Sequence, residues 1–162
     1  MQAGSGEAAG KDDILRKPTI LFLCTGNSCR SQMAEGLLRH AAGHRFEVAS
    51  AGIEKHGLNP LAVRAMAEIG IDISLHMSKS LDDLDSLEFD VVITVCAHAH
   101  ETCPVLAGKT RSIHQPFDDP PRLAADAASD DEALVHYRRV RDEIHAYVKT
   151  LSDIVTSSPV GE

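Results

Sequence analysis

The chain has few of the features that mark a membrane, secreted or nucleic-acid-binding protein. It has no tryptophan, and its 24 acidic residues outnumber its 16 lysines and arginines, which gives a formal net charge of −8. No apolar run approaches the roughly 20 residues needed to cross a bilayer, and residues 1–17 lack the hydrophobic centre of a secretory signal. We therefore expect a cytoplasmic protein with no nucleic acid and no membrane as partner.

Cysteine is also scarce. In a cytoplasmic chain the four cysteines favour catalysis or metal binding over structural disulfides. A length of 162 residues with 43% hydrophobic residues suits one domain with a proper core. We expect a disordered tail over 1–17, one domain over 18–156 and a short second tail over 157–162.

Buried strands alternate with amphipathic helices along this domain. The pattern predicts strands at 19–24, 46–51, 90–96 and 111–114, and helices at about 31–42, 60–69 and 131–155. Asn59 and Pro60 are typical of a helix N-terminus, and Gly43 of a helix end. This order predicts an α/β fold: a single doubly wound domain with a four-stranded parallel sheet and helices on both faces. Cys24 and Cys96 each end a strand, so both should lie on the sheet edge where ligands bind.

Residues 24–31 join a buried strand to a helix and read Cys-Thr-Gly-Asn-Ser-Cys-Arg-Ser. The free amides and the dipole of a helix N-terminus attract anions, and Arg30 can bind two oxygens at once. The same field stabilises a thiolate at Cys24, to which Ser31 is placed to donate a hydrogen bond. The alternative, a chance pairing of a buried cysteine and a surface arginine, fits this junction poorly. The segment predicts a nucleophilic cysteine in an oxyanion cradle formed by Thr25, Gly26, Asn27, Ser28, Cys29 and Arg30.

A carboxylate is expected near such a site if a leaving oxygen must be protonated. The best candidate is in Phe117-Asp118-Asp119-Pro120, after the fourth strand. Pro120 holds the preceding residue extended, which favours Asp119 over Asp118 as the acid. The alternative is an acidic turn with no catalytic role.

Two further cysteines lie seven positions apart, just after the third strand. The segment reads Cys96-Ala-His-Ala-His-Glu-Thr-Cys103. It allows two idle thiols, a zinc site built from Cys96, His98, His100 and Cys103, or a thiol relay in which Cys96 attacks a group held by Cys24 and Cys103 resolves the product. In a relay the segment must loop, because seven helical residues span about 10 Å, beyond the reach of a disulfide.

These residues together resemble the thioredoxin-coupled arsenate reductases, a redox branch of the low-molecular-weight protein tyrosine phosphatases. The resemblance covers about residues 18–150. It rests on the two cysteine segments and on Ser-Ala-Gly-Ile-Glu (50–54), His-Gly-Leu-Asn-Pro (56–60), Ile-Asp-Ile-Ser (71–74), Phe-Asp-Asp-Pro (117–120) and Arg-Val-Arg-Asp-Glu-Ile (139–144).

The resemblance implies arsenate as substrate, with phosphate or sulfate as competing anions. Cys24 would attack arsenate, Arg30 and the loop amides would hold its oxygens, and Asp119 would protonate the departing hydroxide. Cys96 would then attack Cys24 and release arsenite. Cys103 would attack Cys96 in turn, and thioredoxin would reduce the resulting disulfide. Cys29 has no part in this relay and is expected to serve packing; the protein is expected to be a monomer.

Members of this branch can bind potassium through positions that match Asn27, Glu35 and Ser50, together with an acidic residue. That acidic position corresponds here to Lys79. The Lys79 ammonium could neutralise the Asn27 and Glu35 side, so we expect no potassium requirement, no other metal and no cofactor beyond the electrons from thioredoxin.

Two other functions stay open from the sequence. The first is a phosphatase acting on phosphotyrosine or another monoester, which needs the same cradle. Against it, Pro121 and Arg122 follow the Asp-Pro pair where such phosphatases often have tyrosine, and both tyrosines lie in the last helix. The second is a zinc-binding sensor built on the segment from Cys96 to Cys103. Glutaredoxin is an alternative reductant to thioredoxin.

Overall fold

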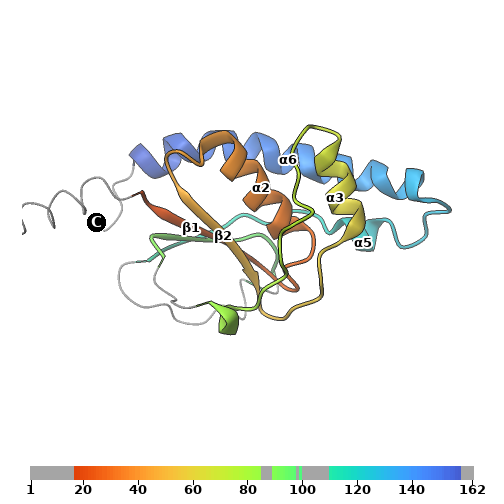
Figure 1. The fold of residues 1–162 in the computed structure, drawn as a ribbon, viewed down its shortest axis with the longest axis horizontal. Helices are drawn as coiled ribbons and strands as arrows, with labels where there is room; N and C mark the ends of the chain where they lie inside the picture. Colours follow the sequence, from red (N-terminus) through yellow and green to blue (C-terminus); the bar gives the residue numbers. More distant parts are fainter. Residues whose placement is uncertain (1–16, 85–88, 98, 100–109, 158–162) are drawn as a thin grey trace, which may run out of the picture.

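The computed structural model describes residues 17–84, 89–97, 99 and 110–157. Its strands form one parallel sheet in the order β2-β1-β3-β4 (Figure 1). The strands are β1 (Thr19–Cys24), β2 (Glu47–Gly52), β3 (Val91–Thr94) and β4 (Arg111–His114). The predicted four-stranded parallel sheet is confirmed, with strand limits within two residues of those expected.

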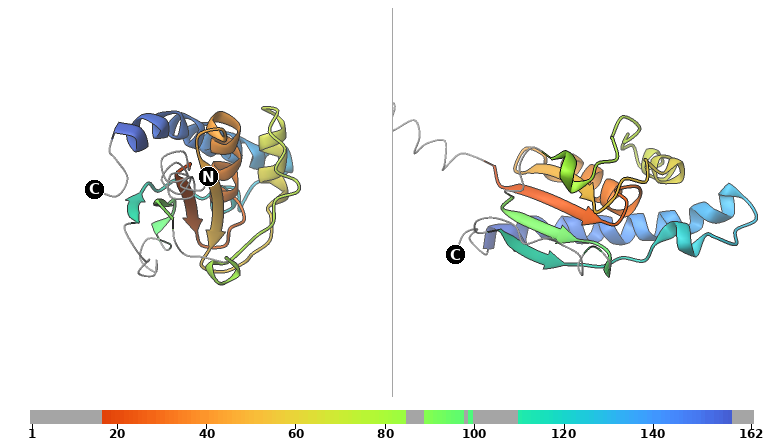
Figure 2. Two further views of the ribbon diagram at one scale, coloured as in Figure 1. Left: turned by 60° about the vertical axis from the view of Figure 1, so that its left-hand side comes forward. Right: turned by 90° about the horizontal axis from the view of Figure 1, so that it is seen from below.

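The helices are α2 (Arg30–Ala42), α3 (Pro60–Ala67), α5 (Pro120–Leu123) and α6 (Asp130–Ser157), with a 3₁₀ helix η1 (Leu81–Asp83). Figure 1 shows α2, α3 and α6 on one side of the sheet and η1 on the other. Figure 2 shows from below how α6 runs behind the strands. The short elements α5 and η1 were not predicted, because neither is long enough to show a hydrophobic period. Within the described ranges, no helix is both long and apolar enough to span a membrane.

The core lies between the sheet and α2 and α6. Strand β1 is central and its residues from Ile20 to Cys24 are buried, as expected for a parallel strand covered on both faces. Helix α6 packs against α2, α3 and α5. The buried residues of α6 recur at helical spacing: Ala133, Leu134, Tyr137, Val140, Arg141, Ile144, Val148 and Leu151.

Helix ends differ in how closely they follow their sequence signals. The Asn59 side chain accepts hydrogen bonds from the amides of Leu61 and Ala62, which is the predicted cap of α3. Gly43 follows α2 as expected, but its φ of −62° is right-handed, so no left-handed stop is formed there. Gly70 has a φ of +82° three residues after α3 and supplies the left-handed turn.

The strand order places the site. The chain passes from β1 through α2 to β2 on one side and later returns to β3 on the other side of β1. A crevice therefore opens beyond the carboxyl ends of β1 and β3, where the connections diverge. Cys24 is the last residue of β1, and Cys96 follows β3 by two positions.

Candidate active site

The loop from Cys24 to Arg30 has its carbonyl groups turned outward. The Cys24, Thr25, Gly26 and Ser28 carbonyls accept from the amides of Ile53, Glu54, His56 and Asn59, respectively. The Asn27 carbonyl accepts from Gln32 Nε2, and the Cys29 carbonyl accepts from the Met33 amide. Within the described residues, no amide from Thr25 to Arg30 donates to another protein group. These amides therefore have no acceptor among the described residues, which is the arrangement in which a loop at a helix N-terminus can bind an anion.

Two close backbone approaches shape this loop. A Cβ atom on Gly52 would lie 2.7 Å from both the Asn27 nitrogen and the Thr25 oxygen, so only glycine lets β2 pass the loop. Asn27 itself has a φ of +49°, in the left-handed region that asparagine tolerates better than most residues. The loop conformation therefore depends on Asn27 being held in place.

A hydrogen-bonded chain reaches the sulfur of Cys24 from Asn27. Cys24 Sγ lies 3.0 Å from Ser31 Oγ, and Asn27 Nδ2 donates to the same hydroxyl over 2.9 Å. Because Ser31 Oγ accepts from Asn27, its own proton is free to point at the sulfur. Asn27 and Ser31 are fully buried and Cys24 nearly so, which places this donor out of competition with water. The arrangement can stabilise a thiolate at Cys24.

A cavity of about 380 Å³ opens over the loop and contains the predicted nucleophile, arginine and acid. Arg30 Nη1 donates to the Phe117 carbonyl over 3.0 Å, and Nη2 lies 3.5 Å from Asp119 Oδ1. The guanidinium is thus anchored from the loop after β4 while facing the cradle. The lining residues are Cys24, Thr25, Gly26, Ser28, Cys29, Arg30, His56, Asn59, Asp119 and Pro121.

The two neighbouring aspartates have separate surroundings. Asp119 lines the cavity beside Arg30, whereas Asp118 pairs with Arg139 of α6 at 3.0 Å and its side chain is 63% exposed. Pro120, the first residue of α5, follows Asp119 directly, and Asp119 is extended with φ −93° and ψ 105°. The geometry thus distinguishes the two carboxylates and leaves Asp119 at the site.

Cys96 contacts the same loop. Its sulfur lies 3.2 Å from Thr25 Oγ1 and accepts from the Ala99 amide over 3.4 Å. Cys96 is buried, and Cys24, Cys29 and Cys96 are all free thiols. Cys103, the predicted resolving thiol, lies outside the described residues, as do the candidate zinc ligands His98 and His100.

Cys29 is a packing thiol in its surroundings. Burial, with the charges of Cys24 and Asp119, raises the pKa of the Cys29 thiol far above its ordinary value. Its backbone belongs to the cradle, but its side chain stays protonated and lies in the core.

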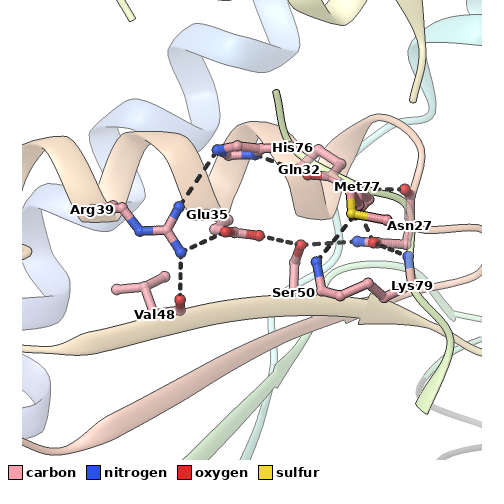
Figure 3. Close-up of polar contacts among 9 residues, drawn as sticks. All are labelled: Asn27, Gln32, Glu35, Arg39, Val48, Ser50, His76, Met77 and Lys79. Carbon is pink, nitrogen blue, oxygen red and sulfur yellow. Dashed lines mark hydrogen bonds and ion pairs between the residues drawn. The ribbon is translucent and has the colours of Figure 1, made fainter. Parts of the chain in front are cut away.

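The expectation that the Lys79 ammonium neutralises Glu35 was wrong. The Lys79 ammonium donates to the Met77 carbonyl over 3.1 Å, and its backbone amide donates to Asn27 Oδ1 over 2.7 Å. The counter-charge of Glu35 is Arg39, one turn along α2, whose Nη2 lies 2.5 Å from Glu35 Oε2 (Figure 3). The expectation rested on Asn27, Glu35, Ser50 and Lys79, and Arg39 was not among them.

Three lining residues were missed as site residues: Pro121, which follows the Asp-Pro pair, and His56 and Asn59. His56 covers Gly26, and a Cβ on Gly26 would lie 2.2 Å from His56 Nδ1. The Asn59 side chain caps α3 and also donates a hydrogen bond from Nδ2 to Tyr137 Oη over 3.0 Å. His56 and Asn59 both follow the carboxyl end of β2, and this shared edge of the sheet was the available signal.

A parallel sheet whose central strand ends in a cysteine, followed by a loop of unpaired amides and a helix, is the arrangement of a class of protein expected to bind a tetrahedral oxyanion beside that cysteine. The chain belongs to the low molecular weight phosphotyrosine protein phosphatase family, whose sequence pattern matches residues 19–158.

Within that family, the chain is similar to arsenate reductases. It is 48% identical to an arsenate reductase of Halalkalibacterium halodurans over 139 residues, which cover 86% of this chain and 98% of the relative. A solved arsenate reductase in its phosphate-binding state superposes with a TM-score of 0.67 at 29% identity, covering 85% of this chain and 98% of that one. A thioredoxin-dependent arsenate reductase of Corynebacterium glutamicum gives a TM-score of 0.63 at 25% identity, covering 94% of this chain and 69% of that one.

Proposed function

We propose that the protein reduces arsenate to arsenite through a relay of Cys24, Cys96 and Cys103, and that thioredoxin restores the thiols. The observation that carries the proposal is the contact of Cys96 with Thr25, which places a second free thiol against the loop of the first. A hydrolase needs the cradle and Cys24 but has no use for this second sulfur.

In the first step the Cys24 thiolate attacks arsenic(V), and one hydroxide leaves as water with the proton of Asp119. The loop amides and Arg30 hold the other oxygens, and Ser31 stabilises the sulfur before attack. The product is a covalent Cys24–arsenic ester.

In the second step the Cys96 thiolate attacks Cys24 Sγ. A Cys24–Cys96 disulfide forms, the sulfur–arsenic bond breaks, and its electron pair reduces arsenic(V) to arsenic(III), which leaves as arsenite. Cys103 then attacks Cys96 and frees Cys24. Thioredoxin supplies the two electrons that reduce the Cys96–Cys103 disulfide. We place this cycle in the cytoplasm, where thiols are kept reduced, and propose that the protein acts as a monomer.

A phosphomonoester phosphatase is the second candidate, favoured by the family and by the cradle itself. The cavity wall disfavours phosphotyrosine: among the described lining residues there is no phenylalanine, tyrosine or tryptophan to stack on an aromatic ring, and Pro121 follows the Asp-Pro pair. Phosphate is therefore proposed as a competing ligand and, in ester form, as a poor substrate.

The test is arsenate-dependent NADPH oxidation with thioredoxin and thioredoxin reductase. Wild type is expected to turn over, and Cys24→Ser, Cys96→Ser and Cys103→Ser are expected to lose turnover. Cys103→Ser should still release about one arsenite per chain, because its thiol acts last. Normal turnover of Cys96→Ser would overturn the relay. Hydrolysis of a small aryl phosphate at a rate above arsenate reduction would favour the phosphatase instead.

A further inference from the structure

Six side chains behind the catalytic loop form a closed ring of hydrogen bonds (Figure 3). One arm runs from Arg39 to Glu35 and Ser50, and the other from Arg39 to His76 and Gln32. Both arms meet at the side chain of Asn27. The bonds are Arg39 Nη2 to Glu35 Oε2 (2.5 Å), Ser50 Oγ to Glu35 Oε1 (2.5 Å), Asn27 Nδ2 to Ser50 Oγ (2.9 Å), Gln32 Nε2 to Asn27 Oδ1 (2.9 Å), His76 Nδ1 to Gln32 Oε1 (3.0 Å) and Arg39 Nη1 to His76 Nε2 (3.4 Å).

Donation around the ring runs from Arg39 to Glu35 by two routes, one direct and one through His76, Gln32, Asn27 and Ser50. Arginine can only donate, so His76 Nε2 must accept and Nδ1 must carry the proton that goes to Gln32. Burial, the largest cause, lowers the pKa of His76, which favours this neutral form. The Lys79 amide donates to Asn27 Oδ1, which fixes the Asn27 amide with its nitrogen toward Ser50 and Ser31. Arg39 is thus the only donor to both arms among these six residues, and Glu35 accepts from both sides.

The charges of the ring explain why it needs Arg39. The Glu35 residue is 5% exposed and carries a carboxylate, which is costly to bury without a partner. The Arg39 side chain is 47% exposed and also donates to the Val48 carbonyl of β2 over 2.6 Å. Arg39 therefore neutralises Glu35 from the surface, and Glu35 is free to accept from Ser50.

The ring connects to the nucleophile through one residue. Asn27 Nδ2 donates to both Ser50 and Ser31, and Ser31 Oγ lies 3.0 Å from Cys24 Sγ. An unpaired Glu35 carboxylate would add negative charge behind the thiolate and would loosen Asn27 from Ser50. Either change weakens the donor to Cys24 and the left-handed turn that aims the loop amides.

We infer that Arg39 is a positioning residue for Cys24: it is the resident counter-cation of Glu35 and holds the ring that orients Asn27, Ser31 and the oxyanion cradle. The inference rests on the proposed function for its effect on arsenate turnover, but its effects on anion binding and on the Cys24 thiol do not depend on that function. A cavity of about 220 Å³ lined by Gly36, Arg39, His40, Gly70, Ile71, Asp72 and His76 opens at this end of the ring. A small cation can reach Glu35 from there once the Arg39 side chain is removed.

The experiment uses the reduced full chain and the variants Arg39→Ala, Arg39→Lys and Arg39→Ala/Glu35→Gln. Arg64→Ala is the matched control. The Arg64 side chain is similarly exposed (51%), and its Nη1 lies 3.5 Å from Asp130 Oδ2 in an ion pair away from the ring. Phosphate affinity is measured by calorimetry, and Cys24 alkylation by iodoacetamide at pH 7 by peptide mass spectrometry. Steady-state kcat and KM for arsenate are measured alongside.

Arg39→Ala is expected to weaken phosphate binding and to slow Cys24 alkylation by about tenfold each, whereas Arg39→Lys and Arg64→Ala stay within about threefold of wild type. Millimolar guanidinium chloride should restore Arg39→Ala relative to equal sodium chloride and leave Arg64→Ala unchanged. If Arg39→Ala does not fold, the double variant decides, since it buries no unpaired carboxylate and should be nearer to wild type in alkylation. A folded Arg39→Ala with unchanged phosphate affinity and alkylation would overturn the inference, as would a double variant as slow as Arg39→Ala. If arsenate is not reduced at all, the proposed function fails while the binding and alkylation results still judge the role of Arg39.

Discussion

Thr25 Oγ1 lies 3.2 Å from Cys96 Sγ, so the second thiol touches the loop that holds the first. The contact follows from the sheet: β1 and β3 are hydrogen-bonded neighbours, and Leu23 is paired with Thr94 in their register. The residues just beyond the two carboxyl ends are therefore brought together by the parallel pairing itself. This is the part of the proposed relay that the described residues support directly.

A Cys24–Cys96 disulfide should therefore accumulate when the third thiol is removed. In Cys103→Ser, one equivalent of arsenate is expected to convert most of the protein to this disulfide, because the attack of Cys96 on Cys24 has no later step to consume it. Non-reducing peptide mass spectrometry would detect the linked peptides. Cys96→Ser treated in the same way is the control. Predominance of a Cys24–Cys29 link in Cys103→Ser would contradict the proposed order.

The two aspartates before Pro120 should differ sharply in mutagenesis. Asp119→Asn removes the carboxyl beside Arg30 and should lower kcat for arsenate by about 10²–10⁴-fold, the usual contribution of a general acid. Asp118→Asn is the matched control, because Asp118 faces solvent and pairs with Arg139. Its kcat should stay close to that of wild type. Equal losses in both variants would mean that the pair acts through loop structure and not through proton transfer.

The parallel sheet, the loop from Cys24 to Ser31 and the place of Asp119 in the cavity were predictable because each depends on contiguous sequence. Apolar runs mark the strands, and the loop from Cys24 to Ser31 carries its own helix start. Asp119 is next to a proline that restricts it, which is also a local effect. Local sequence patterns could therefore identify the residues whose positions are set mainly by their neighbours in the chain.

The missed features depend on residues far apart in the chain. His56 covers Gly26 only because the segment after β2 runs along the loop after β1. Arg39, and not Lys79, pairs with Glu35 because the two lie one helical turn apart on α2, while the Lys79 ammonium is directed at Met77. Matching residues by position in the sequence suggested which charged group lies near Glu35, but only the packing shows to which atom a long side chain extends.

The contact of Gly26 with His56 gives a test of the cavity wall. Gly26→Ala would place a Cβ 2.2 Å from His56 Nδ1 and 2.8 Å from its Cβ, so the wall or the loop must shift. We expect kcat/KM for arsenate to fall by about 10–100-fold, as for other small displacements of a reacting geometry. The double variant Gly26→Ala/His56→Gly removes both close contacts and should be no less active than His56→Gly alone. A double variant whose kcat/KM for arsenate is as low as that of Gly26→Ala would show that the substitution distorts the loop itself and not the contact with His56.

Potassium should not activate the enzyme. Both Glu35 oxygens already have partners, Ser50 and the Arg39 guanidinium, so a monovalent cation has little to add. Replacing sodium by potassium at constant ionic strength should leave arsenate reduction unchanged in wild type. Potassium should likewise leave arsenate reduction by Lys79→Ala unchanged, because Arg39 and not Lys79 neutralises Glu35. A several-fold rise with potassium in wild type would contradict this prediction.

Stability in acid should report the ion cluster that ties α3 to α6. Hydrogen bonds from Arg138, the largest cause, and from Arg141 lower the pKa of Glu68 from its ordinary 4.5 to about 2. A carboxyl with a lowered folded pKa adds stability above its unfolded pKa, and this stability is lost as the pH falls from about 4.5 towards 2. Because the group is partly exposed, the gain is modest and weakened by salt.

Glu68→Gln should accordingly have a lower melting temperature than wild type at pH 7, and the difference should narrow steadily below pH 4.5. Differential scanning calorimetry between pH 7 and pH 3 would measure it. In an Arg138→Ala background, which removes the bidentate partner of Glu68, the same substitution should cost less at pH 7. A melting difference that stays constant across this pH range would show that Glu68 acts through packing or neutral hydrogen bonds, since only the carboxylate form distinguishes the ion cluster from its amide replacement.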